Sequence, residues 1–422
     1  MEIDYINSAF FPSKEITNPE FFAGRKDEIK DSIHALSDPG SFISFYGLRG
    51  VGKSSVVNQV KLIAEGNVQL PKRLKIERYI PSNGFNYLTI LTNCDSFTQT
   101  VSDLLKRILF GDNNSPSLLS YTKTGDRKLE QIKETYKASG GVGLMGLKLE
   151  AGSQEERSYS SYLSDDLIQQ FKLVLGTVQK DNQDKSGILI LIDEFDVLKD
   201  KTGFSSIIKT CSNDFVKFGV SGIANTLTEL ISDHSSIGRQ LHSISIKKMN
   251  PEEMHGIIKR AEVHIRNEIQ FSTDASNAII NHAEGFPYFV HLLGKEAFYE
   301  AFENCQKTID LKTIEVLREK ICSGRLKTIY EDIYHNSVKS SPQRELILKL
   351  FAEDETNEIF SEKVYADAKD LGVSNPSQLM RELTTPQDGS LGVLTKVREQ
   401  YYRFTDPVFK VYARLRTWKF NS

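Results

Sequence analysis

A glycine-rich segment from Gly47 to Ser54 has the spacing G-x-x-x-x-G-K-[ST]. Glycines at this spacing let backbone N–H groups ring an anion, and the N-terminus of a following helix adds its positive dipole end. Lys53 would reach the β- and γ-phosphates of a nucleotide, and the Ser54 hydroxyl would ligate Mg2+. An apolar run at 42–46 precedes the motif and a helix-capable segment at 54–64 follows it. This strand–loop–helix context predicts a phosphate-binding loop rather than a flexible glycine turn with a solvated lysine. The residues expected to surround the phosphates are Gly47, Leu48, Arg49, Gly50, Val51, Gly52, Lys53, Ser54 and Ser55.

A second segment, GILILIDEFD at 187–196, joins a continuous apolar run to three carboxylates. Such a run predicts a strand buried on both faces of a parallel sheet, and ligands gather at the carboxyl ends of such strands. We expect Asp193 to hold Mg2+ directly or through water, and Glu194 to polarise an attacking water as general base. Asp196 is expected to be a structural cap or a supporting group. The alternative is a strand that simply ends in an acidic turn.

Two further segments supply candidate residues for hydrolysis. A strand predicted at 215–220 is followed by Asn225, which could hydrogen-bond the γ-phosphate or the attacking water; Ser221 is the runner-up. The alternative is that Asn225 caps a helix at 226–232. Arg239 precedes a short strand at 241–246 and could reach the nucleotide of a neighbouring subunit. The alternative for Arg239 is a solvated surface side chain.

Glycines mark two other turns. Gly24 lies between Phe22 and a predicted helix that follows Arg25, and its backbone could lie beside a flat ligand; a plain helix N-terminus is the alternative. Gly285 and Pro287 stand where one predicted helix ends and the next begins.

Composition bounds the class of protein. The chain has 422 residues, of which 39% are hydrophobic and 26% charged, which suits two or three globular domains. A net charge of -3 gives no overall polycation for nucleic acid, so any basic surface must be local. The four cysteines are scattered, which predicts a reducing, cytoplasmic setting without disulfides or a zinc site. The longest apolar run, 188–192, is too short for a bilayer, and no signal pattern opens the chain.

The order of elements predicts three domains. Residues 1–249 should form an α/β core with a parallel sheet, in which 112–165 are an insertion holding a pair of short strands at 140–152. Residues 250–340 are expected to be all-helical, and 341–422 should form a winged helix, with three helices, a β-hairpin and a last helix.

The predicted wing and tail carry a local excess of basic residues, which would suit phosphate contacts with double-stranded DNA. These residues are Lys396, Arg398, Arg403, Lys410, Arg414, Arg416 and Lys419. The third helix would be 377–385, with Arg381. The alternative is a winged helix that binds protein or packs within the chain, because Glu353, Asp354 and Glu358 lie on or near its first helices.

With these motifs in place, the chain resembles P-loop ATPases at the border of the AAA+ and STAND groups, near the origin-recognition-type and archaeal-type ATPases. FAGR at 22–25 resembles their adenine-side motif, and the segments at 47–55 and 188–196 resemble their Walker A and Walker B motifs. GFP at 285–287 resembles the G-x-P of STAND and archaeal-type proteins, and GIANTL at 222–227 resembles the sensor-1 stretch of initiators. YRFTDP at 402–407 resembles the last strand and turn of the archaeal-type winged helix.

The resemblance implies a P-loop NTPase core, a helical lid and a C-terminal winged helix, with ATP and Mg2+ as cofactors. It places Phe22, Gly24 and Arg25 on the adenine side, and Gly285 and Pro287 in the lid near the base. Two features depart from the family. The interval from Lys53 to Asp193 is 140 residues (193 minus 53) and longer than the family core needs. The lid also lacks the sensor-2 arginine of initiators, which favours the STAND side.

These expectations define three hypotheses. The first is an ATP-hydrolysing molecular switch, slow or partner-stimulated, whose nucleotide state controls homo-oligomer assembly or DNA and partner binding through the winged helix. The second is a DNA-binding or DNA-loading protein in which ATP is a structural ligand. The third is a protein-interaction scaffold in stress or phage defence.

Overall fold

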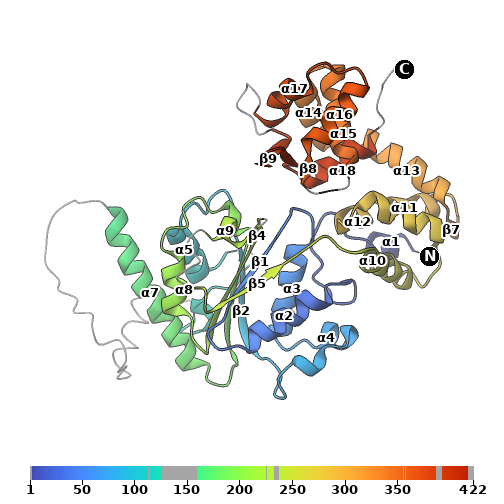
Figure 1. The fold of residues 1–422 in the computed structure, drawn as a ribbon. Helices are drawn as coiled ribbons and strands as arrows, with labels where there is room; N and C mark the ends of the chain where they lie inside the picture. The colour runs from blue at the N-terminus through green and yellow to red at the C-terminus, as the bar shows by residue number, and fades with distance from the viewer. Residues whose placement is uncertain are drawn as a thin grey trace. The chain divides into compact units, whose positions relative to one another are not determined.

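The structure is a computed structural model, and it describes residues 2–112, 115–125, 159–224, 226–231, 237–354, 356, 358–385 and 392–416. It contains two compact units (Figure 1). The core unit comprises Glu15–Leu48 and Lys53–Lys247, and the C-terminal unit comprises Met1–Lys14, Arg49–Gly52 and Lys248–Ser422. The division after Lys247 lies close to the predicted boundary at 249. The first 14 residues pack with the C-terminal unit rather than with the core, and the lid and winged helix form one unit.

The core unit is built on a parallel sheet of five strands in the order β2-β3-β4-β1-β5, which confirms the predicted α/β class. The strands are β1 Phe42–Gly47, β2 Tyr87–Asn93, β3 Gly187–Asp193, β4 Val216–Ile223 and β5 Leu241–Ser245. Strand β3 is buried at every position, as expected for a central strand covered on both faces.

Helices cover both faces of this sheet (Figure 1). One face packs into a hydrophobic cluster that includes Phe171, Ile190, Phe204 and Phe218 and involves α5, α7 and α8. Helix α3 begins at the end of the glycine-rich loop and contacts β1 to β4, and it lies on the other face. The core helices are α2 Lys26–Ser37, α3 Lys53–Ala64, α4 Gln69–Leu74, α5 Val101–Phe110, α7 Tyr159–Asp181, α8 Phe204–Cys211 and α9 Leu227–Leu230, with the short helices η1 Glu77–Tyr79, η2 Leu119–Tyr121 and η3 Phe195–Val197.

Part of the predicted insertion belongs to the core. Leu118 and Leu119 are buried in the hydrophobic cluster, and the Tyr121 hydroxyl donates to the Thr89 carbonyl at 2.8 Å. Helix α7 packs against α5. The insertion is therefore narrower than predicted. Residues 126–158, with the expected strands at 140–152, lie outside the described residues.

In the C-terminal unit the segment after Lys248 is mostly helical, but two short strands interrupt the predicted all-helical segment. The helices are α10 Pro251–His264, α11 Thr273–Ala283, α12 Pro287–Glu303, α13 Leu311–Ser323 and α14 Arg325–Val338, and the short strands β6 Gln270–Phe271 and β7 Thr308–Ile309 pair beside them. The N-terminal helix α1 Ile3–Asn7 contacts α12. Phe10 follows it and is fully buried against Phe271, Phe298 and Gly294. Phe10 thus helps to anchor the N-terminal segment to the helices of this unit.

The last part of the chain has the predicted winged-helix order. Its elements are α15 Pro342–Glu353, β8 Ile359–Phe360, α16 Ser361–Asp370, α17 Pro376–Thr384, β9 Leu394–Arg398, β10 Tyr401–Phe404 and α18 Pro407–Leu415. Strand β8 adds a third strand to the predicted hairpin, in the order β8-β10-β9. None of the helices in the described part of the chain combines the length and apolar character that a membrane crossing requires.

Candidate functional site

Lys53 opens α3 and closes the glycine-rich loop. Its side chain is 9% exposed, and its ammonium donates to the carbonyls of Gly47 and Leu48 at 3.2 and 2.9 Å. The ammonium is therefore held at the mouth of the loop by the loop's own backbone. Phosphate oxygens are stronger acceptors for a charged donor than these neutral carbonyls.

The acidic end of β3 lies at the same end of the sheet as the glycine-rich loop, where the carboxyl ends of the parallel strands meet. Strand β4 separates β3 from β1, so the ends of these two strands are about 10 Å apart, two strand spacings. Asp193 is 6% exposed, and its Oδ1 accepts the Glu194 N–H at 2.9 Å. The pairing of Ile192 with Val220 and of Phe45 with Ser221 places Asp193 on the sheet face opposite the hydrophobic cluster. Because α3 covers that face, Asp193 and the first turn of α3, with Ser54, lie on one side of the sheet.

Glu194 follows at the sheet edge and is exposed. Its backbone is left-handed, with φ 55° and ψ 34°, at the start of η3. This conformation costs a residue with a side chain about 1 kcal/mol, and such strain is common at functional sites. The turn directs the chain from the end of β3 into η3, where the Val197 N–H donates to the Glu194 carbonyl at 3.0 Å.

Asp196 has the predicted supporting role. Its Oδ1 accepts the N–H of Ile223 at 2.8 Å, which ties the loop after β3 to the end of β4. Ser221 lies on β4, is fully buried, and its hydroxyl has no hydrogen-bond partner among the described residues. Asn225, the first choice for contacting the γ-phosphate, lies outside the described residues, so its role stays a prediction.

Arg239 lies near the opposite end of the strands, where β1 and β5 begin. It is exposed in the turn before β5, and the first residue of β5, Leu241, pairs with Phe42 at the start of β1. The glycine-rich loop follows the other end of β1, at Gly47. Arg239 is therefore out of reach of its own chain's loop, so the predicted role toward a neighbouring subunit and the alternative of a solvated surface side chain both stay open.

The segment before α2 is held against α3. The Ile16 N–H donates to Ser55 Oγ at 3.0 Å, and Gln59 Nε2 donates to the Ile16 carbonyl at 2.9 Å. Ser55, predicted to bind nucleotide, thus has a structural contact. Gln59 was not predicted; the signal in the sequence is a polar residue within the otherwise apolar stripe of α3.

The FAGR turn presents backbone rather than side chains. Phe22 and Arg25 are each 3% exposed, and Arg25 pairs with Glu28 at 3.0 Å. Arg73 donates to the Phe22 carbonyl. Gly24 and Arg25 both have left-handed backbone, with φ 65° and 62°. Both side chains are internal, so this turn offers its backbone to a ligand, and its placement on the adenine side of a nucleotide stays a prediction.

In the C-terminal unit, GFP at 285–287 forms the turn between α11 and α12, as the plain alternative predicted. Gly285 has φ 84°, and its carbonyl accepts the Met249 N–H at 2.9 Å. A Cβ at Gly285 would lie 2.7 Å from Lys248 Cβ, so only glycine fits. Pro287 opens α12.

The loop tip Arg49–Gly52 belongs to the same unit. A Cβ added at Gly52 would lie 3.6 Å from Pro287 Cγ, and one at Gly50 would lie 3.2 Å from Val408 Cγ2. Arg49 Nη1 lies 3.8 Å from the Asp406 carboxylate, which caps α18. Asp406 had no signal in the sequence because its partner lies more than 350 positions away (406 minus 49).

Three of the seven residues in the predicted DNA-binding cluster are engaged within the C-terminal unit, so the exposed basic face is smaller than predicted. Lys410 is 4% exposed and donates to the Thr356 carbonyl at 2.9 Å, and burial lowers its pKa to about 8. Arg414 donates to the Ala352 carbonyl at 2.7 Å. Arg416 pairs with Glu331 at 2.9 Å.

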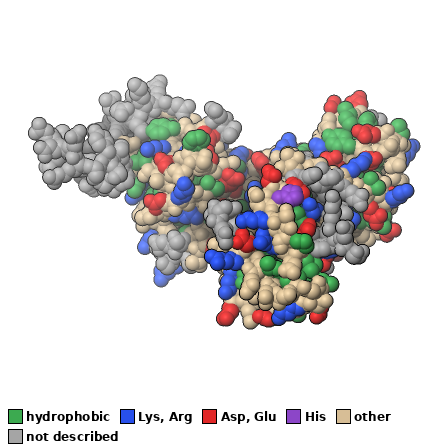
Figure 2. Space-filling model, turned by 90° about the horizontal axis from the view of Figure 1, so that it is seen from above, with side chains coloured by type: hydrophobic (Ala, Val, Ile, Leu, Met, Phe, Trp, Pro, Cys, Tyr) green, Lys and Arg blue, Asp and Glu red, His purple; other side chains and the backbone are tan. Residues whose placement is uncertain are grey.

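The exposed remainder is small. On the wing, Arg398 pairs with Glu358 and stacks on the Tyr401 ring, Lys396 is exposed and Arg403 is half-buried. Lys419 lies outside the described residues. On the face drawn in Figure 2, Lys and Arg side chains are interspersed with Asp and Glu.

The donors at the sheet edge suit Mg2+. Asp193 supplies a carboxylate and Ser54 a hydroxyl, both hard oxygen ligands, and Mg2+ takes most of its other ligands from phosphates and water. Among the described residues no cluster of three or more His, Cys, Asp or Glu side chains could hold a metal by itself.

Comparison with known proteins gives structural likeness alone. No protein-family model and no curated protein sequence matches the chain. Among solved structures, it is similar to the ORC1 protein of Aeropyrum pernix in complex with DNA, with 12% identity, 93% of this chain and 92% of the other covered, and a TM-score of 0.43. It is also similar to Cdc6p from Pyrobaculum aerophilum, with 12% identity, 97% of each chain covered and a TM-score of 0.44. The RuvB Holliday junction branch migration motor of Thermotoga maritima has 14% identity, with 92% of this chain and 94% of the other covered and a TM-score of 0.37. At these scores the functional argument rests on the residues of this chain.

Proposed function

We propose that the protein is an ATP-binding and ATP-hydrolysing switch of the AAA+/STAND type. The observation that carries this proposal is the joint placement of Lys53 and the Asp193–Glu194 pair at one edge of a parallel sheet, with one strand between them. A lysine at an amide-lined loop binds phosphates, and a carboxylate pair across the edge suits a metal-bound triphosphate and its attacking water.

Each residue has one task in this proposal. The backbone of the loop from Gly47 to Gly52 and the Lys53 ammonium bind the phosphates. Ser54 and Asp193 hold Mg2+, which when bound neutralises charge on the phosphates. Glu194 orients the attacking water and accepts its proton. Asp196 fixes the segment after β4 relative to Glu194.

Two substitutions test the proposal. Lys53→Ala should abolish ATP binding, and Glu194→Gln should retain binding but lower kcat at least about 100-fold, within the range that general-base removal produces. Lys61→Ala is the matched control, because Lys61 lies on the same helix and, among the described residues, its ammonium pairs with Glu65. Calorimetry with ATP and phosphate-release assays provide the readouts. Unchanged ATP affinity in Lys53→Ala, or unchanged hydrolysis in Glu194→Gln, would refute the site.

A second candidate function is DNA binding through the wing, favoured by the exposed Lys396 on β9 and the half-buried Arg403 on β10. The full-length variant K396Q/R403Q should bind duplex DNA more weakly, with a salt slope lower by about two. Lys307→Gln, an exposed lysine elsewhere in the unit, is the control. No binding by the wild type at about 50 mM salt would leave protein partners, or assembly with further copies of the chain, as the output of the switch.

A further inference from the structure

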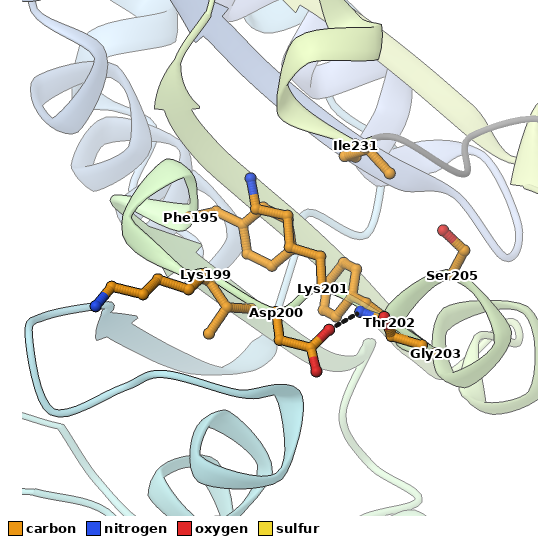
Figure 3. A pocket seen from close by; sticks show the side chains of 10 residues that line it. Phe195, Lys199, Asp200, Lys201, Thr202, Gly203, Ser205 and Ile231 are labelled. Carbon is orange, nitrogen blue, oxygen red and sulfur yellow. Dashed lines mark hydrogen bonds between the residues drawn. The ribbon is translucent and has the colours of Figure 1, made fainter.

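A cavity of about 450 Å³ lies beside the loop that follows β3. Phe195, residues 198–205 and Ile231 line it (Figure 3). Phe195, Phe204 and Ile231 belong to the hydrophobic cluster on one face of the sheet. Because α3 and Asp193 lie on the other face, the cavity is separate from the proposed phosphate site. Its volume is in the range of about 300–1,000 Å³ that is typical of small-molecule sites.

Lys201 is one of the two lysines that line this cavity. Lys201 Nζ is 5.0 Å from the centre of the Phe195 ring and donates to the Leu230 carbonyl at 3.0 Å. Burial lowers the pKa of Lys201, and the charge of the Asp196 carboxylate opposes this shift. An anion placed beside such a group is attracted more strongly than in water.

Lys199 provides a natural comparison two positions earlier. Figure 3 shows that its side chain extends away from the other residues that line the cavity, and it is exposed. Asp200, between the two lysines, is turned toward the Thr202 backbone, whose N–H it accepts at 2.9 Å. This contact, with the Thr202 hydroxyl, lowers the pKa of Asp200. The one carboxylate of the lining is therefore already hydrogen-bonded.

A second polar group that lines the cavity, the Ser205 hydroxyl, can donate a hydrogen bond to an oxyanion. Ser205 is 4% exposed and lines the cavity, and its hydroxyl makes no hydrogen bond within the described part of the chain. It lies in the first turn of α8, whose N-cap, Gly203, has φ 82°. The helix N-terminus adds a favourable field for negative charge. Leu198, Phe204 and Ile231 supply apolar wall for the rest of a ligand.

We propose that this cavity binds a small organic anion, a carboxylate or phosphomonoester with a compact apolar body, between Lys201 and Ser205. The cavity shares η3 with the proposed general base, because Phe195 directly follows Glu194. Occupancy should therefore change the rate of ATP hydrolysis. Only this last coupling rests on the proposed function; the binding itself does not.

Calorimetry on the full-length protein with excess ADP and Mg2+ tests binding. The probes are benzoate and phenyl phosphate, with neutral benzamide as the control ligand. At least one anion should bind saturably, at least about tenfold more tightly than benzamide, and the tighter of the two identifies the head group. Lys201→Met should lower the affinity for that anion at least about tenfold, whereas Lys199→Met should change this affinity less than about twofold.

No saturable binding of either anion up to about 10 mM, or equal binding by wild type and Lys201→Met, would overturn the proposal. If circular dichroism shows that Lys201→Met is unfolded, Ser205→Ala replaces it in the test. Ser205→Ala should then bind the anion more weakly than the wild type, and equal binding would overturn the proposal. Loss of ATPase activity in Glu194→Gln with anion binding intact would leave both proposals standing. Anion binding by a protein that never hydrolyses ATP would refute the proposed function alone.

Discussion

Arg239 gives the sharpest prediction, because its position allows action only between subunits. From Leu241, level with Phe42, to Gly47 is five residue steps along β1, or about 16 Å. An extended arginine side chain spans only about 7 Å. If Arg239 stabilises the transition state, it must do so at the nucleotide of another copy.

The expected magnitude follows from this geometry. An arginine finger contributes about 10³–10⁵ in kcat, so Arg239→Ala should lower ATPase activity at least about 100-fold without changing ATP affinity. Mixing equal amounts of Arg239→Ala and Lys53→Ala should restore activity. Half of the subunits then retain the lysine and half of their neighbours retain the arginine, so about a quarter of the wild-type rate returns with random assembly.

The assay is phosphate release at a concentration where light scattering shows oligomers. Lys106→Ala, an exposed residue on α5, is the control and should leave both single-variant and mixed rates unchanged. Full ATPase activity of Arg239→Ala would mean that this side chain is solvated and takes no part in hydrolysis. A mixture no more active than the sum of its two parents, in an oligomeric preparation, would contradict action between subunits.

Three other perturbations test the structure. Asp196→Ala should lower kcat at least about tenfold with ATP affinity unchanged. Asp196→Asn keeps an acceptor for the Ile223 N–H and should keep kcat near the wild-type value. An equal loss of kcat in both variants would contradict a positioning role. Phe10→Ala should destabilise the C-terminal unit by about 3–5 kcal/mol in urea unfolding, against about 0.5 kcal/mol or less for Phe97→Ala, whose ring is 84% exposed. Burial lowers the pKa of His291 to about 4, so the unfolded chain binds a proton that the folded chain does not between about pH 6.5 and 4. Stability is therefore fully present above pH 6.5 and should fall by about 3 kcal/mol as pH drops to 4, while His291→Asn should lose this part of the pH dependence. A wild-type midpoint that does not move over this window would contradict a buried neutral imidazole.

Local patterns predicted the elements well, because their causes are local. The apolar run of β3, the glycines before Lys53, and the Asn-Pro opening of α10 each specify structure through neighbouring residues. The separation of a helical segment from an α/β core also followed from periodicity. The role of Asp196 was predicted because a carboxylate after a buried strand has few other partners than nearby backbone.

Burial and pairing across the chain decided the rest. The seven basic residues near the C-terminus predicted a DNA face, yet Lys410, Arg414 and Arg416 are held by carbonyls and carboxylates from elsewhere in the C-terminal unit. Composition counts charges, but it does not show which charges face water. Likewise Phe22 and Arg25 are internal, and the buried Phe10 helps to anchor the N-terminal segment.

By itself the sequence determined the glycine-rich loop between a strand and a helix, the acidic end of β3 and the class of fold, because glycine spacing and apolar periodicity act over a few residues. The tertiary structure alone placed β4 between the two motifs, placed Arg239 at the opposite end of the strands, and formed the cavity that Lys201 and Ser205 line. Strand order and cavities depend on contacts between residues far apart in the chain, and the free energy of those contacts is not written in any local pattern.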